Sequence, residues 1–147
     1  MAKAIKVINP GFVETVRVSF AKQGLMGTYG AWLVSIAPGA VTIEVPHNMR
    51  LTQQQGFFHG GVVAAVADAA GGYAALTMMP ERSEVLTVEY KVNFMRPALG
   101  PLLRATGTVI RSGKTLTVAR MDVVCGQEGS LETCAVVQAT FMRIDIA

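Results

Sequence analysis

The chain has 147 residues, of which 51% are hydrophobic and 16% are charged. This length fits one folded domain, residues 1–147, and so high an apolar content indicates much buried surface, including surface between subunits. The 13 basic and 10 acidic residues are spread along the chain and give a formal charge of +3, without the basic run typical of nucleic-acid-binding proteins. We therefore expect a homo-oligomer of single domains that binds no nucleic acid.

The sequence also carries no pattern typical of secretion, a membrane span or a metal site. Its first twelve residues contain no apolar segment of signal-peptide length. Residues 60–80 are the most apolar stretch, but Asp68 lies near their middle, where a charge costs about 2.5–3.5 kcal/mol in a membrane. Cys125 and Cys134 lie in strand-like sequence without CxxC spacing. We expect a cytoplasmic protein with reduced core cysteines, no bound metal and no membrane contact.

The first part of the chain predicts one helix and a pair of strands. Asn9, a possible capping residue, and a proline precede an apolar stripe at helical spacing, which predicts a helix over residues 12–24. Residues 29–37 and 40–45 flank a Pro-Gly turn and predict two short strands. Residues 46–58 are polar and irregular.

The second part predicts a long helix followed by four strands. Residues 60–78 include seven alanines and would form a helix of about 28 Å. Residues 86–95 alternate apolar and polar side chains, as expected of a strand with one buried face. That face would comprise Leu86, Val88, Tyr90, Val92 and Phe94. Three more strands are predicted at 102–111, 115–124 and 131–144, and short connections favour a four-stranded meander. A sheet curled around the apolar helix satisfies this order of elements.

Asp68 is the main candidate for chemistry, because no basic residue lies within one helical turn of it. Burying an ionised carboxylate without a partner is costly, and burial raises its pKa. One explanation is structural: an ion pair with a residue from a strand, or exposure at an open edge. The other is functional: a nucleophile or a general base. The residues alone leave both open.

The start of the same helix is the second candidate. His59 is followed by Gly60 and Gly61, where free backbone N–H groups favour developing negative charge, although an ordinary turn also uses such glycines. Gly60 and Asp68 are eight residues apart, about 12 Å along a helix, too far to reach one carbon atom together. Two helices packed antiparallel across a twofold axis would bring them together. We therefore expect a dimer, or a dimer of dimers, with composite sites.

These motifs resemble those of the PaaI-type hotdog thioesterases. The resemblance rests on residues 59–61 followed by Asp68, on the NFMRPA segment at 93–98, and on the RSGKT turn at 111–115. It covers roughly residues 30 to 144. It implies an α+β hotdog fold, in which a curved antiparallel sheet wraps around a long central helix. It further implies hydrolysis of an acyl-coenzyme A thioester, with no cofactor other than the coenzyme A of the substrate.

The resemblance also implies roles for individual residues. Asp68 would attack the thioester carbonyl or activate water, and the Gly60 N–H would polarise that carbonyl. The Gln53 amide would orient the carbonyl or the water, and the Thr87 hydroxyl would position water. His59 would chiefly fix its loop by a hydrogen bond. The remaining substrate-binding residues would be Gly61 and the basic turn Arg111, Ser112, Gly113 and Lys114, although composition alone favours an ordinary solvated turn there.

Two other functions are compatible with the same fold. An enoyl-CoA hydratase or dehydratase would need His59 as an acid or base partner of the carboxylate. A non-catalytic acyl-CoA sensor would need an output module, which the chain has no room for. The acyl group is expected to be medium-chain or aryl, with a pocket or core formed by Phe57, Phe58, Tyr73, Met78 and Met79.

Overall fold

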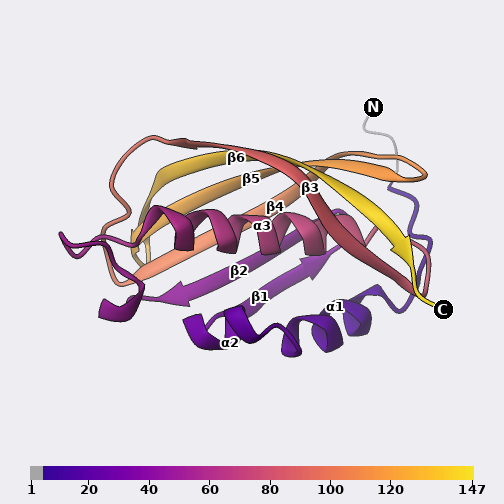
Figure 1. Ribbon diagram of the computed structural model, residues 1–147, viewed down its shortest axis with the longest axis horizontal. Coiled ribbons are helices and arrows are strands. Elements are labelled where there is room, and N and C mark those ends of the chain that lie inside the picture. Colours follow the sequence, from indigo (N-terminus) through magenta and orange to yellow (C-terminus); the bar gives the residue numbers. More distant parts are fainter. Residues whose placement is uncertain (1–4) are drawn as a thin grey trace.

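The computed structural model describes residues 5–147 as a curved, six-stranded antiparallel sheet wrapped around one long helix, α3 (Gly60–Leu76) (Figure 1). The strand order is β1-β2-β4-β5-β6-β3, so β1 and β3 form the edges. The strands are β1 (Trp32–Ala37), β2 (Ala40–Pro46), β3 (Ser83–Phe94), β4 (Leu102–Ser112), β5 (Leu116–Gln127) and β6 (Ser130–Asp145). The predicted α+β architecture is confirmed.

Close contact between α3 and the sheet forms the core. Nearly every residue of α3 is buried, and its many alanines and glycines keep its surface narrow. Gly107 of β4 lies against the helix backbone, and a Cβ atom at this position would overlap the backbone of Ala70 and Gly71. A Cβ on Gly71 would in turn overlap Met121 and Phe141. The helix is therefore held at a distance that allows no methyl group between the two backbones.

The N-terminal region contains one more helix than the sequence predicts. α1 (Phe12–Ala21) matches the first part of the predicted helix, and a separate short helix, α2 (Gly24–Tyr29), follows it. Gly30, with φ +66°, closes α2, so β1 begins at Trp32 rather than at residue 29. The predicted start of this strand was wrong because α2 has six residues, fewer than two turns, and so shows no helical periodicity. A 3₁₀ turn, η1 (Met49–Leu51), precedes α3.

The predicted four-stranded meander is wrong in one strand. β4, β5 and β6 pair in sequence order, but β3 pairs with β6 and not with β4. Residues 95–101 carry the chain from β3 across three strand spacings to β4, about 14 Å, which is within the reach of about 23 Å for seven extended residues. This connection is tied to the loop before α3 by a hydrogen bond from Phe58 N to Ala98 O (3.0 Å).

The predicted buried face of β3 is also largely wrong. Leu86 and Val88 are 50% and 54% exposed, and Phe94 is 58% exposed. A β-bulge between Thr87 and Glu89 leaves Val88 without a paired residue on β6. The bulge shifts the alternation of side chains by one. Before it, Val85 and Thr87 face α3, and after it Val92 packs against the core.

We expect Gly107→Ala to destabilise the protein, because the added methyl group overlaps the backbone of α3. Overpacking of this kind costs about 1–3 kcal/mol, and more where backbone must move. Urea unfolding followed by circular dichroism measures the change. Gly27→Ala is the matched control, since a Cβ there has no neighbour within 4 Å. Equal stability of the two variants would contradict the packing described here.

Candidate active site

The start of α3 presents one free backbone N–H group. His59 is the N-cap residue, and its Nδ1 atom accepts a hydrogen bond from Gly61 N (2.8 Å). The N–H of Gly60 has no acceptor among residues 5–147. Since the N-terminus of a helix carries partial positive charge, this N–H is suited to a developing oxyanion. His59 forms the loop-fixing hydrogen bond that the sequence suggested, and this bond occupies the N–H of Gly61.

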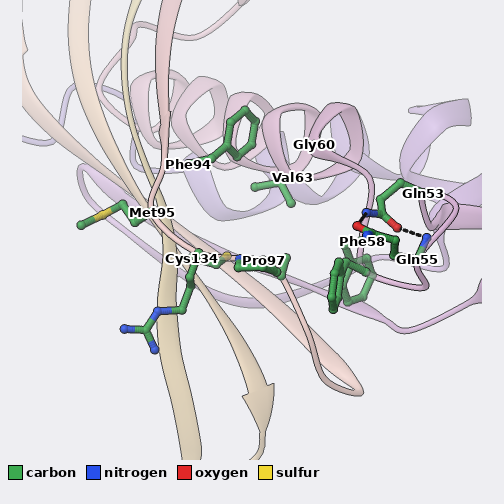
Figure 2. A pocket seen from close by; sticks show the side chains of 12 residues that line it. Gln53, Gln55, Phe58, Gly60, Val63, Phe94, Met95, Pro97 and Cys134 are labelled. Atoms are coloured by element: carbon green, nitrogen blue, oxygen red, sulfur yellow. Dashed lines mark hydrogen bonds between the residues drawn. The ribbon is translucent and has the colours of Figure 1, made fainter.

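An apolar cavity of about 440 Å³ opens beside Gly60. Figure 2 shows Gln53 at the right-hand end of the lining residues, with its amide hydrogen-bonded to Gln55. Gln53 Nε2 donates to Gln55 Oε1 (3.0 Å), and Gln53 Oε1 accepts from the Gln55 backbone N. The predicted grouping of Gln53 with Gly60 is thus present. The other lining residues are Phe57, Phe58, Val63, Phe94, Met95, Arg96, Pro97, Ala98 and Cys134.

Asp68 lies in a separate, polar cavity of about 110 Å³ between α3 and β3. The bulge in β3 turns Thr87 toward the helix, and Thr87 Oγ1 donates a hydrogen bond to Asp68 Oδ1 (2.7 Å). Burial raises the pKa of the Asp68 carboxyl above its ordinary value, and the Thr87 hydrogen bond lowers it in part. Asp68 is therefore a fixed, partly desolvated carboxylate with enhanced basicity.

One chain does not bring all the predicted site residues together. Gly60 lines the apolar cavity and Asp68 lines the polar one. Their eight-residue separation corresponds to about 12 Å along α3. The turn at 111–114 is exposed, and Figure 1 shows it at the end of the sheet opposite the start of α3. Within a chain, the structure groups Gly60 with Gln53 and Asp68 with Thr87.

The residues predicted to form the acyl pocket are likewise divided between the two cavities. Phe57 and Phe58 line the apolar cavity, Tyr73 lines the polar one, and Met79 is buried in the core. Sequence reasoning missed Ser19, Gln23 and Glu84, which also line the polar cavity. Ser19 lies on a surface helix and Gln23 lies just after its end. Polar residues are common at such positions, so the sequence gives no sign that these two line a cavity.

The remaining sequence expectations concern metals, membranes and thiols. Residues 5–147 contain no cluster of three or more His, Cys, Asp or Glu side chains able to hold a metal ion. None of the helices described is both long and apolar enough to cross a membrane. Cys125 and Cys134 are free and buried, and burial raises the pKa of these thiols to about 12 and about 11. Both are core residues, as expected.

Residues 55–132 match the sequence profile of the Thioesterase superfamily. The chain belongs to this family. A thioesterase family protein from Silicibacter pomeroyi has a similar structure, with a TM-score of 0.90 and 42% identity over 92% of this chain and 99% of the other. The Escherichia coli PaaI protein shares the fold at 20% identity, with a TM-score of 0.83 over 95% and 99% of the two chains.

A sequence relative is named for its substrate. The medium/long-chain acyl-CoA thioesterase YigI of E. coli is 28% identical over 82 residues, which cover 47% of this thioesterase and 53% of YigI. Together these relationships confirm the predicted PaaI-like hotdog family. The protein is a thioester hydrolase.

The raised pKa of Asp68 predicts how stability depends on pH. A carboxyl whose pKa is higher in the folded state stabilises the fold below its unfolded pKa and loses that contribution as pH rises through its folded pKa. Asp68→Asn removes the cost of ionisation and keeps an acceptor for Thr87. We expect its Tm to exceed that of the wild type at about pH 7, by a margin that shrinks toward about pH 4.

Differential scanning calorimetry across this pH range measures the margin. Asp145→Asn serves as the control, because this carboxylate is 72% exposed and should give no such gain. A wild type as stable as Asp68→Asn at about pH 7 would mean that Asp68 is fully solvated.

Proposed function

We propose that this thioesterase hydrolyses acyl-coenzyme A, with a medium-chain or aryl acyl group, at a site shared between two subunits. The observation that carries the proposal is the pairing of Thr87 with Asp68, a partly buried carboxylate of raised pKa on a helix whose first N–H has no acceptor in the described part of the chain. The reaction consumes water and needs no separate cofactor, since coenzyme A is part of the substrate. The name of the relative YigI supports this substrate class.

In the proposed mechanism the thioester carbonyl oxygen accepts a hydrogen bond from Gly60 N–H. This bond strengthens as the oxygen becomes an oxyanion, and the helix terminus adds favourable charge. Asp68 either attacks the carbonyl carbon or takes a proton from the attacking water, and Thr87 holds it in position. The C–S bond then breaks and the thiolate of coenzyme A leaves and takes up a proton. If Asp68 is the nucleophile, water then hydrolyses the mixed anhydride, which releases the acid and restores the carboxylate. Label found in Asp68 after a single turnover in ¹⁸O-labelled water would demonstrate nucleophilic attack, because general-base catalysis places the label in the acid product alone.

The edge strand β3 supports a shared site. Leu86, Val88 and Phe94 are each at least half exposed, and β3 presents an unpaired edge. Such an edge favours pairing with a second strand. A second copy paired antiparallel along β3 would cover these side chains and align the two α3 helices antiparallel. Gly60 of each subunit would then approach Asp68 of the other.

The same arrangement would orient the substrate, because it places the coenzyme A part at one end of the site. Antiparallel pairing would carry the exposed turn at 111–114 of one subunit to the Gly60 end of its partner. Arg111, Lys114 and the backbone N–H groups of this turn suit the phosphates of coenzyme A. We therefore assign the coenzyme arm to the apolar cavity beside Gly60. The acyl arm extends past Asp68 into the polar cavity, toward Tyr73, five residues or about 7.5 Å further along the helix.

Gly60→Pro tests the oxyanion contact. Proline lacks the N–H and is favoured at the first position of a helix, and His59 already has the extended backbone that a following proline requires (ψ 139°). We expect kcat for an acyl-CoA panel, measured by thiol release, to fall about 10²–10³-fold. Gly60→Ala adds the same contact with Phe94 (3.1 Å) but keeps the N–H. An equal loss in Gly60→Ala would mean that packing, not the N–H, is responsible.

Asp68→Asn should lower kcat at least 10²-fold, because the base or nucleophile is removed. No hydrolysis of any acyl-CoA by the wild type would overturn the proposed function and favour a hydratase or a sensor.

Mixing two inactive variants tests the shared site. In a 1:1 refolded mixture of Gly60→Pro and Asp68→Asn, half of the dimers are mixed, and each mixed dimer holds one intact composite site of two. We expect about one quarter of wild-type activity, one half multiplied by one half. If dimers shown to be mixed recover no activity, the site is not shared between subunits.

A further inference from the structure

The polar cavity beside Asp68 has a far wall that the hydrolysis itself does not use. Ser19 of α1, Gln23 just after it, Tyr73 of α3 and Glu84 of β3 form this wall. If the acyl arm extends past Asp68, as proposed above, its far end meets these side chains. The inference therefore rests on the proposed function and names its substrate class.

Tyr73 anchors the wall. Its side chain is 2% exposed, and its hydroxyl accepts a hydrogen bond from Gln23 Nε2 (2.8 Å) and lies 3.2 Å from Ser19 Oγ. The ring of Phe20 packs edge-on against it, with the ring centroids 5.9 Å apart. These contacts hold Gln23 and Ser19 in place without occupying their remaining polar atoms.

The wall offers hydrogen-bond acceptors that have no donor. Gln23 Oε1 and the Glu84 carboxylate accept no side-chain hydrogen bond within the part of the chain that the structure describes. The Glu84 charge acts on the Tyr73 hydroxyl, where it adds to the rise in pKa caused chiefly by burial. Glu84 lines both this cavity and the groove next to it, so its negative charge acts on the Tyr73 side of the cavity.

Among residues 5–147, two carboxylates and no cationic side chain line this cavity. A separate groove next to this cavity shares Ser19 and Glu84 with it and is also lined by Lys22 and Arg82. Neither cation forms an ion pair with Glu84 among residues 5–147. The cavity is thus complementary to a hydrogen-bond donor with positive charge, and it repels a carboxylate. Its volume of about 110 Å³ equals that of roughly four water molecules, which suits the last few atoms of an acyl chain.

Gly72 keeps this space open. At Gly71 a side chain would overlap Met121 and Phe141, so packing against the sheet requires glycine there. At Gly72, which lines the cavity, a Cβ would meet Phe141 at 3.5 Å and Val85 at 3.8 Å, which are ordinary contacts. Alanine would fit at this position and would favour the helix by up to about 1 kcal/mol. The consequence of glycine at this position is additional room in the cavity.

We infer that the polar cavity binds the far end of the acyl group and selects an acyl chain that ends in an amino group. The ammonium donates hydrogen bonds to the Glu84 carboxylate and Gln23 Oε1. The substrate class is therefore an ω-aminoacyl-coenzyme A.

Three acyl-CoAs of similar length test the inference. They are 6-aminohexanoyl-CoA, its neutral isostere heptanoyl-CoA, and adipoyl-CoA, which carries a terminal carboxylate. We expect kcat/KM for the aminoacyl substrate to exceed that for heptanoyl-CoA about 10- to 100-fold, the effect of a charge-assisted hydrogen bond. Adipoyl-CoA should be the poorest. Hydrolysis of heptanoyl-CoA at least as efficient as that of the aminoacyl substrate would overturn the inference and leave the proposed function intact, whereas no hydrolysis of any acyl-CoA would overturn the proposed function itself.

Variants of the cavity residues test whether the preference for the aminoacyl substrate comes from this cavity. Glu84→Gln should bring the ratio of the two kcat/KM values close to one, and Glu84→Asp should restore part of it. Glu81→Gln is the matched control, because Glu81 is exposed and lies outside the polar cavity; it should keep the ratio. A ratio unchanged in Glu84→Gln would place the selectivity elsewhere. Gly72→Ala should lower kcat/KM for 6-aminohexanoyl-CoA about tenfold relative to acetyl-CoA, with Gly27→Ala as the control for a glycine-to-alanine change in a helix.

Discussion

The close approach of α3 to the sheet is the constraint on which the rest of the structure depends. Gly107 and Gly71 leave no space between the helix and the inner strands, so the helix has one position relative to the sheet. That position fixes Asp68 opposite β3 and leaves the start of α3 beside the loop from Gln53 to Phe58. Larger side chains at the contact would lift the helix and separate Asp68 from its partner Thr87.

Two local irregularities then shape the candidate active site. The bulge at Val88 turns Thr87 toward Asp68, although a regular strand would place Thr87 on the outer face with Glu89. The cap formed by His59 occupies the N–H of Gly61 and leaves that of Gly60 free. In both cases a departure from regular secondary structure exposes or orients a polar group, as is common at functional sites. The same bulge leaves apolar side chains of the β3 edge exposed, which connects the geometry of the carboxylate to the proposed dimer.

The two cavities differ in character in a way that suits the two arms of a thioester. The cavity beside Gly60 is lined largely by apolar side chains, while the cavity beside Asp68 is small and polar. A substrate that bridges them across two subunits would have its scissile bond between the free N–H and the carboxylate. The polar wall of Ser19, Gln23 and Tyr73 comes from α1, the residues just after it, and α3, so the docking of the N-terminal helix would contribute directly to the proposed acyl side of the site.

The sequence by itself determined the central helix, the hairpin strands, the family, and the positions of His59 and Gly60 at the start of that helix and of Asp68 within it, because these depend on local periodicity and on motifs of fixed spacing. The tertiary structure alone decided that β3 pairs with β6, since a seven-residue connection is compatible with several neighbours. It also decided which way Thr87 points, because a bulge depends on how two strands pair. The alternating apolar and polar residues of β3 alone do not reveal it. The polar cavity was likewise decided by packing, because Ser19, Gln23 and Glu84 are far apart in sequence and meet only when α1 docks against α3 and β3.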